Sequence, residues 1–291
     1  MAALELPFIS VVIATYQRSD LLVETITDVL AQDYSRFEVI VVDQSEEPVD
    51  GLDASISVIH TRPPHLPRAR NVGLLAAKGD VVVFVDDDVA VPPRFLTMHA
   101  KCYADPRVGG VAGRVILNRD PSRPLTAPPA TGVDFDRDES GDVPFARGCN
   151  MSFRKSELLA VGLFDERFSV SEEEDVCFAL RRRGLRLIFS PEAWLVHRQA
   201  EHGGTRPGSS PVMDRPVFYH DKMYFALKNV GGLDFWRIVW DTYRHALPPR
   251  ARGKQVWQRQ VAWSHGTLAA IAEFARYGVR HDPLPYRRSA L

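Results

Sequence analysis

The sequence predicts an α/β protein: a mostly parallel, Rossmann-like sheet with helices on both faces, followed by a helical C-terminal extension. Short apolar runs rich in β-branched residues alternate with helical patterns over the first 90 residues, which is typical of parallel strands joined by helices. Two of these runs, 37–43 and 81–86, end in an aspartate. From residue 234 onwards, amphipathic helical patterns replace the strand patterns.

Composition narrows the classes of protein to consider. The chain has 291 residues, 45% of them hydrophobic, which is enough for one large domain with an appendage. A net charge of −1 excludes a global field that recruits nucleic acid. The three scattered cysteines lack metal-ligand spacing and indicate a reducing compartment. With neither a secretory signal nor a bilayer-spanning apolar run of roughly 20 residues, we expect a cytoplasmic protein, at most peripheral at the inner face of the membrane.

The first half of the chain predicts the order strand, helix, strand, strand, helix, strand. The strands are expected at 8–15, 37–43, 56–60 and 81–85, and the helices after Ser19 and at 67–78. Crossover connections of this kind make the sheet mostly parallel. Asp43 and Asp86 then lie at one carboxyl edge, where the ligands of open α/β sheets gather.

Asp86, Asp87 and Asp88 directly follow the last of these strands. Three adjacent carboxylates repel one another unless a cation or water screens them. A hard divalent ion with oxygen ligands, itself holding phosphates, would relieve the repulsion. The alternative is an acidic turn that caps the next helix.

The middle of the chain adds shorter elements around a long irregular segment. Helices are expected at 95–103 and 155–161, a glycine-rich strand at 108–115, extended structure at 145–153, and two short strands at 185–189 and 193–197. The segment 118–143 has little periodicity, as in a functional lid or a disordered insertion. His197 closes the last strand, where it is either a site residue or a satisfied surface or core histidine.

Residues 171–184 carry the signature of a complete helix. Ser171 is the expected cap, Glu174 completes a capping box, and Gly184 ends the helix. Acids in the first turn and bases in the last complement the helix dipole, which alone would account for the acids. Asp175 shares the apolar face and points inward, so it is the candidate for a general base.

Several motifs resemble, in order and spacing, those of family 2 inverting glycosyltransferases of the GT-A fold. They extend over about residues 6–200 and comprise Ala14-Thr15-Tyr16-Gln17-Arg18, Val42-Asp43, Ala69-Arg70-Asn71-Val72-Gly73 before Gly79-Asp80, Phe84-Val85-Asp86-Asp87-Asp88, Arg147-Gly148-Cys149-Asn150-Met151-Ser152-Phe153-Arg154, Gly162-Leu163-Phe164-Asp165-Glu166 and Glu174-Asp175. The resemblance implies transfer of a sugar from a nucleoside-diphosphate sugar to an acceptor hydroxyl, with Mg²⁺ or Mn²⁺ at the diphosphate. Many relatives carry a glycine where this chain has Glu173.

The same resemblance implies roles for residues of the donor site. Thr15 and Asp43 would hold the nucleobase, and Arg70 would lie near the ribose or pyrophosphate. Asp86, with Asp87 beside it, would face the ribose.

It further implies that Asp88 binds the metal, with His197 as a metal-side histidine. Asp175 would be the general base, and Asn150 and Glu174 are expected on the acceptor side. The acceptor would be a glycan, a lipid-linked precursor or a small molecule.

The region after residue 200 predicts a mobile loop and a connecting helix at 201–233, then an amphipathic helical extension at 234–291. These follow a nucleotide-sugar-binding catalytic domain at 1–200. The polar loop 202–208 would let Arg206 fold over the donor diphosphate. Trp236, Val239, Trp240 and Tyr243 form one helical stripe near basic residues. Such a stripe suits an anionic membrane surface, or packing on the catalytic domain, or a homodimer contact.

Two other classes of protein compete with a glycosyltransferase. A phosphatase of the haloacid dehalogenase type could use the aspartate triplet, but it would leave Asp43 and Asp175 without a role. A non-catalytic nucleotide-sugar binding protein could share the fold, although the Glu174-Asp175 pair argues against it. The sugar transferred and its acceptor are not encoded in any pattern of the sequence.

Overall fold

The computed structural model describes residues 6–117, 138–198, 200, 215–247 and 254–277. The chain divides into two compact units, which we describe separately. The first takes the chain as far as Phe164 and then from Val176 through the last strand of the sheet. The second combines Asp165–Asp175 with the three C-terminal helices. The sequence-based boundaries assigned Asp165–Asp175 to the catalytic domain, 1–200, and the first of these helices to the connecting segment, 201–233.

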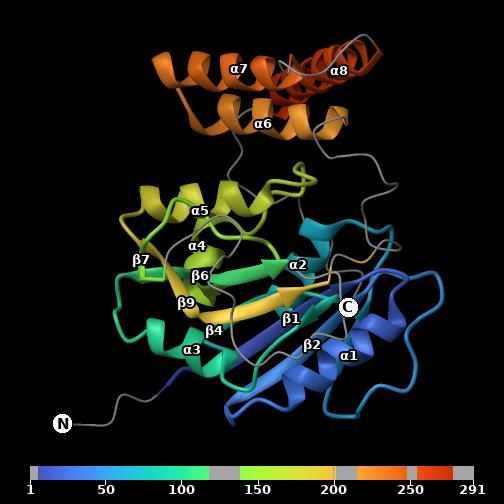
Figure 1. Cartoon of the computed structure of the whole chain (residues 1–291), viewed down its shortest axis with the longest axis vertical. Helices are drawn as coiled ribbons and strands as arrows, with labels where there is room; N and C mark the ends of the chain where they lie inside the picture. The colour runs from blue at the N-terminus through green and yellow to red at the C-terminus, as the bar shows by residue number, and fades with distance from the viewer. Residues whose placement is uncertain (1–5, 118–137, 199, 201–214, 248–253, 278–291) are drawn as a thin grey trace. The chain divides into compact units, whose positions relative to one another are not determined.

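The first unit is an open sheet flanked by helices, as predicted (Figure 1). Its strands lie in the order β3-β2-β1-β4-β8-β6-β9-β5, and β7 pairs with β9. Their bounds are β1 Ile9–Thr15, β2 Phe37–Asp43, β3 Ser57–His60, β4 Val81–Asp86, β5 Val89–Ala90, β6 Val108–Leu117, β7 Gly141–Asp142, β8 Asn150–Arg154 and β9 Arg186–His197. The helices are α1 Ser19–Leu30, α2 Leu66–Ala76, α3 Phe95–Cys102, α4 Lys155–Val161 and α5 Glu172–Arg182, whose first turn belongs to the second unit.

Parallel pairing of the first four strands sets the edge on which the site lies. β1 pairs in parallel with both β2 and β4, and β2 pairs in parallel with β3. β8 is antiparallel to its neighbours β4 and β6. The carboxyl ends of β1, β2 and β4 therefore meet at one edge, as the sequence predicted.

Apolar side chains fill both faces of this sheet. Alternate residues of β1, such as Val11 and Ile13, join the cluster that includes residues of α1 and α3. On the other face, a Cβ on Gly73 of α2 would lie 2.4 Å from Cγ1 of Val12. Glycine at this position lets α2 lie directly on β1, which holds the edge of the sheet rigidly.

The last strand of the sheet differs from the sequence-based prediction. Residues 186–197 form a single strand, β9, instead of two. The parallel pairing of β9 with β6 shifts register between Gly113 and Val115, so the ladder continues past Pro191 through a local irregularity. Proline predicts a break because it lacks an N–H, but strands tolerate it at such a bulge.

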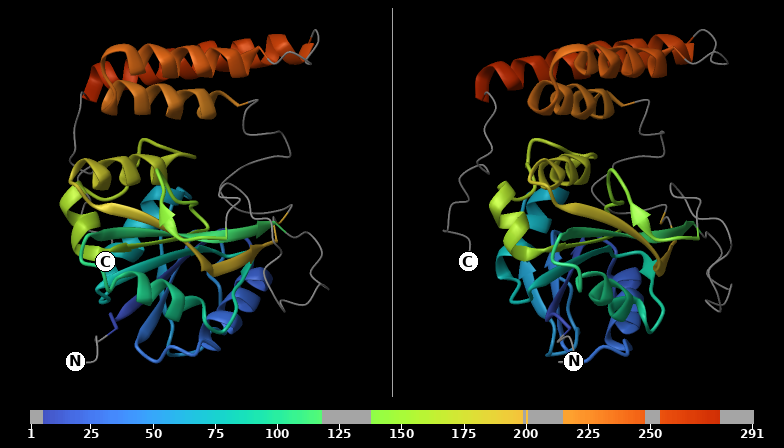
Figure 2. Two further views of the ribbon diagram at one scale, coloured as in Figure 1. Left: turned by 60° about the vertical axis from the view of Figure 1, so that its left-hand side comes forward. Right: turned by 90° about the vertical axis from the view of Figure 1, so that its left-hand side faces the viewer.

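The second unit is built from α6 Pro216–Asn229, α7 Gly232–Ala246 and α8 Lys254–Tyr277 (Figure 2). Phe168 packs with Met223, Tyr224 and Ala270 in its core. A Cβ on Gly266 of α8 would lie 2.2 Å from the carbonyl oxygen of Pro216, so glycine allows α8 to approach α6 closely. Among the described residues, no helix is both long and apolar enough to cross a membrane.

Candidate active site

The aspartate triplet and His197 are brought together by the pairing of β5 with the end of β9. Asp86 ends β4, and Asp87 and Asp88 form the turn into β5. Val89 of β5 pairs antiparallel with His197 at the end of β9. The Asp88 main chain and side chain accept N–H groups from Arg198 and Ala200, both at 2.9 Å. The turn is therefore locked to the end of β9.

Nε2 of His197 lies 3.3 Å from Oδ2 of Asp86 and 3.3 Å from Oδ1 of Asp88. Oδ1 of Asp88 is buried and accepts no hydrogen bond from any described residue. Adjacent ligands of an octahedral Mg²⁺ site with bonds of about 2.1 Å lie about 3 Å apart. Nε2 of His197 thus adjoins carboxylate oxygens of both Asp86 and Asp88, and these donor types suit a hard divalent cation.

Cys149 also approaches this cluster. Its sulfur, a carboxylate oxygen of Asp86 and a ring nitrogen of His197 all lie within 4.8 Å of one another. Burial raises the pKa of the Cys149 thiol far above its usual range, so the thiol stays protonated at neutral pH. Because only the thiolate is a good ligand and Mg²⁺ or Mn²⁺ prefers oxygen, Asp88 completes the set better than Cys149.

Asp87 is held by residues of the turn after β1. The guanidinium of Arg18 lies 3.0 Å from Oδ1 of Asp87 and 3.5 Å from Oδ2 of Asp88. Thr15 donates its hydroxyl hydrogen to Oδ2 of Asp87 at 2.7 Å. Burial raises the pKa of Asp87 to about 6, although Arg18 and Thr15 act in the opposite direction. Asp87 is thus anchored by Thr15, the last residue of β1, and by Arg18 in the turn that follows.

Asp43 stands at the predicted edge, but its carboxylate points into its own loop. Its two oxygens accept the backbone N–H groups of Ser45, at 2.9 Å, and Val49, at 2.8 Å. The next residue, Gln44, accepts the N–H of His65 at 2.6 Å. In this structure the Asp43 side chain orders the loop after β2, which forms one wall of a pocket.

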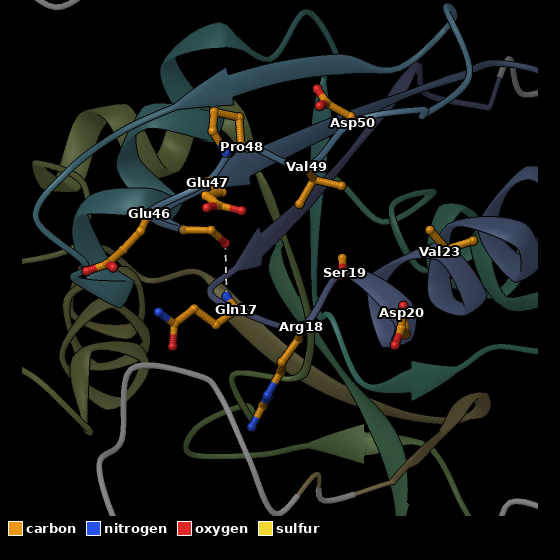
Figure 3. Close-up of a pocket in the computed structure, with 11 residues that line it drawn as sticks. Gln17, Arg18, Ser19, Asp20, Val23, Glu46, Glu47, Pro48, Val49 and Asp50 are labelled. Atoms are coloured by element: carbon orange, nitrogen blue, oxygen red, sulfur yellow. Dashed lines mark hydrogen bonds between the residues drawn. The ribbon is translucent and has the colours of Figure 1, made fainter.

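That pocket has a volume of about 680 Å³ and lies between the turn after β1 and residues 45–50 (Figure 3). Its lining includes four acids, Asp20, Glu46, Glu47 and Asp50. Arg18 is the one basic residue in this lining, and its side chain extends away from the 46–50 loop. An acidic wall of this kind repels a diphosphate, whereas Arg18 attracts one.

Arg70 lies next to Asp86 from the other side. Its Nη2 donates to the carbonyl oxygen of Gly148 at 2.9 Å and lies 3.6 Å from Oδ1 of Asp86. A Cβ on Gly148 would lie 2.7 Å from the same nitrogen, so glycine makes room for the guanidinium. The structure thus places Thr15 and Arg70 against carboxylates of the aspartate triplet.

Asn150 does not reach the surface. It is fully buried, and its amide group donates to the carbonyl oxygens of Arg114 and Ala193 at 2.9 and 3.0 Å. Its Oδ1 lies 3.0 Å from Nε2 of His99. Burial lowers the pKa of His99 to about 4, so this histidine is neutral at pH 7. Because Asn150 is enclosed in this way, we do not propose it as an acceptor residue.

The Glu174-Asp175 pair belongs to the second unit, where α6 contacts it. Lys222 donates to both carboxylate oxygens of Glu174 at 2.6 Å. Asp175 is only 4% exposed and accepts from Lys228 and Asn229, each at 2.7 Å. Arg206, the residue expected over the donor diphosphate, lies outside the described residues.

Comparison with known proteins identifies the family. The sequence model described as "Glycosyl transferase family 2" matches residues 10–160, which is more than half of the chain and contains nearly all of β1, all of β2 to β8 and the aspartate triplet. The chain belongs to glycosyltransferase family 2. The match covers all the aspartates of the candidate metal site, and the phosphatase alternative finds no support.

Two curated relatives of this glycosyltransferase have names that refer to different substrates. It is 29% identical over 219 residues to a glucosyl-dolichyl phosphate glucuronosyltransferase of Haloferax volcanii, covering 67% of this chain and 70% of the relative. It is also 29% identical over 227 residues to a pre-mycofactocin glycosyltransferase of Mycobacterium tuberculosis, covering 69% of this chain. The match spans about half the length, 47%, of that mycobacterial relative.

Solved structures confirm the fold of this glycosyltransferase. A mannosyltransferase of Pyrobaculum calidifontis, in complex with GDP-Man and Mn²⁺, gives a TM-score of 0.56 at 18% identity, covering 94% of this chain and 77% of that one. GalNAc-T7 with UDP, GalNAc and Mn²⁺ gives a TM-score of 0.61 at 14% identity, covering 95% and 59%. At such identities the likeness shows the fold alone.

Sequence reasoning missed three residues that the structure places beside predicted ones. Arg18, in the turn after β1, neutralises Asp87 and Asp88. Lys228 and Asn229, at the end of α6, hold Asp175. Arg18 stands within a quoted motif, so its proximity to the aspartates could have been suspected, whereas no spacing rule connects Asp175 with α6.

Proposed function

We propose that this glycosyltransferase transfers a sugar from a nucleoside-diphosphate sugar to an acceptor hydroxyl with inversion at the anomeric carbon. The observation that carries the proposal is that carboxylate oxygens of Asp86 and Asp88 each lie 3.3 Å from Nε2 of His197. Asp88 and His197, with Asp86 beside them, would hold Mg²⁺ or Mn²⁺. When bound, the ion would supply Lewis-acid stabilisation of charge on the departing diphosphate.

In the proposed reaction the acceptor oxygen bonds to the anomeric carbon as the bond from that carbon to the diphosphate oxygen breaks. The electron pair of the broken bond leaves with the nucleoside diphosphate. Asp175 takes the proton of the acceptor hydroxyl, which is a very weak acid and needs a base. Arg18 and Arg70 would attract the donor's phosphates, since both guanidinium groups adjoin the aspartate turn.

The acceptor class is inferred from relatives. One relative is named for glucosyl-dolichyl phosphate and another, from Rhizobium meliloti, for succinoglycan biosynthesis. We therefore propose that the acceptor is a growing glycan or a lipid-linked sugar.

Helices α7 and α8 are proposed to contact an anionic membrane surface. Tyr243 packs on Trp263, with ring centroids 5.2 Å apart, but Trp236 and Trp240 are 66% and 60% exposed. Residues 232–291 contain ten basic and four acidic residues in a chain whose net charge is −1. Exposed tryptophan in a stretch of sequence with an excess of basic residues suits the headgroup region of a bilayer.

A panel of UDP-, GDP- and dTDP-sugars tests the enzymatic proposal. We expect one nucleotide class to raise the melting temperature more strongly with Mn²⁺ than with EDTA, and to release nucleoside diphosphate on addition of acceptor. Stabilisation without any release across a range of glycan and lipid-linked acceptors would favour a non-catalytic binding protein instead.

A further inference from the structure

The carboxylate of Asp175 is enclosed by the end of α6. Lys228 donates to its Oδ2 and Asn229 to its Oδ1, both at 2.7 Å. The side chains of Asp175 and Lys228 are each 6% exposed. A carboxylate so deeply buried is costly unless hydrogen bonds and a nearby cation compensate for the lost water.

Lys228 is shared between two carboxylates. Its Nζ lies 2.7 Å from Oδ2 of Asp165 as well as 2.7 Å from Oδ2 of Asp175. Arg167 already engages Asp165 with two nitrogens, each at 2.7 Å. The charges of Asp165 and Asp175 are thus balanced by Arg167 and Lys228. Because Arg167 pairs with Asp165, Lys228 is the cation that faces Asp175.

The local helix geometry favours the same arrangement. Lys228 lies in the last turn of α6, where the dipole favours a cation, and Asp175 lies in the first turn of α5, where it favours an anion. Each carboxylate oxygen has two acceptor sites, so the bonds from Lys228 and Asn229 leave room for an incoming proton.

Among the described residues, charged and titratable groups from three segments lie at Asp175 or at its neighbours Lys228 and Tyr224. They are Asp165, Arg167 and Glu174 on the segment that leads into α5, Lys222, Tyr224 and Lys228 on α6, and Glu273 on α8. Burial raises the pKa of the Tyr224 phenol, so Tyr224 is neutral across the working range. Lys222 is taken up by Glu174.

We infer that Lys228 is the positioning residue of the proposed base: it places a positive charge against the Asp175 carboxylate and, with Asn229, fixes its orientation. This inference rests on the proposed function, because it gives Asp175 the role of base. Lys228 itself touches no reacting atom. Removing Lys228 should therefore change the acidic limb of the pH–rate profile.

The test is the pH–rate profile of nucleoside diphosphate release, with the donor of the UDP-, GDP- and dTDP-sugar panel that turns over fastest. Lys228→Met should move the acidic limb up by about one pH unit or more, a factor of roughly ten in proton affinity. Lys228→Arg retains the charge and should restore the limb, even if its longer side chain lowers kcat. Lys222→Met, the matched removal of a lysine on the same helix, should leave the limb in place.

Asp165→Asn provides a second test, in which the acidic limb should shift in the opposite direction. It removes the carboxylate that competes for Lys228, so the acidic limb should move to lower pH. If Lys228→Met does not fold, as judged by its circular dichroism, the Asp165→Asn profile decides the matter. An acidic limb that is unchanged in Lys228→Met, or in Asp165→Asn, overturns the inference.

The result is separable from the proposed function. If Asp175→Asn is inactive while the Lys228→Met limb stays at the wild-type pH, only the positioning role fails. If Asp175→Asn retains normal turnover, the base assignment itself fails and the positioning role falls with it.

Discussion

The guanidinium of Arg18 lies 3.0 Å from the carboxylate of Asp87, so that the turn after β1 supplies the counter-charge for the turn after β4. Asp87 is 3% exposed and also accepts the hydroxyl of Thr15. A buried carboxylate of this kind is stable only while its partners remain. Two loops that are far apart in the sequence are thereby fixed relative to each other.

Replacing Arg18 should weaken both the site and the fold. Arg18→Met leaves Asp87 buried without its cation, which we expect to cost about 3 kcal/mol of the free energy of unfolding. Donor affinity should fall about tenfold, because the aspartate turn then carries more negative charge towards the diphosphate. Denaturant unfolding and calorimetric titration measure the two effects. Arg107→Met, at an exposed pair with Asp105, is the control, and equal behaviour of the two variants would contradict this role for Arg18.

The metal site makes a separate prediction. Asp88→Ala removes a carboxylate from the Asp86, Asp88 and His197 cluster, so donor binding should lose its dependence on Mn²⁺. We expect affinity measured with Mn²⁺ to fall at least tenfold, about 1.4 kcal/mol, and affinity in EDTA to change little. Calorimetry with and without Mn²⁺ gives both numbers. Asp53→Ala, at an exposed aspartate, should retain the Mn²⁺ effect, and its retention in Asp88→Ala would disprove the assignment.

His99 should make the first unit sensitive to acid. Burial lowers its pKa from 6.5 to about 4 in the folded state, so between these values the unfolded chain binds more protons. The free energy of unfolding should therefore fall as pH drops from about 6.5 to 4, by on the order of 3 kcal/mol. Urea unfolding at pH 7 and pH 4.5 measures the difference. In His99→Gln the same pH change should cost less, and an unaltered pH dependence would show that His99 is not responsible.

The membrane contact predicts a loss of binding when the exposed tryptophans are replaced. Trp236→Ser with Trp240→Ser should abolish flotation with vesicles that contain anionic lipid, while the melting temperature changes little, because both side chains are exposed. Wild-type protein should bind less at high salt. Flotation of neither form, with a dimer in light scattering that the double variant abolishes, would instead identify the stripe as a homodimer contact.

The sequence predicted the strands and the polar edge because both depend on local patterns. Buried β-branched runs gave β1, β2 and β4, and strand polarity alone placed Asp86 and His197 at the carboxyl ends of their strands. Other features depend on tertiary contacts that no local pattern encodes. Lys228 is 53 residues from Asp175, and Asn150 is enclosed by backbone carbonyls of two distant strands. Pro191 predicts the end of a strand, but β9 continues past it because β6 pairs with residues on both sides.

The measurement that tests the central claim most directly is a comparison of Asp175→Asn with wild-type protein, using the active donor, Mn²⁺ and acceptor. Calorimetry should show donor affinity within a factor of about two, since the substitution is nearly isosteric, whereas nucleoside diphosphate release should fall by a factor of at least 10². Asp175→Asn protein that binds donor and turns over at the wild-type rate would contradict the account, because another group would then have to accept the proton.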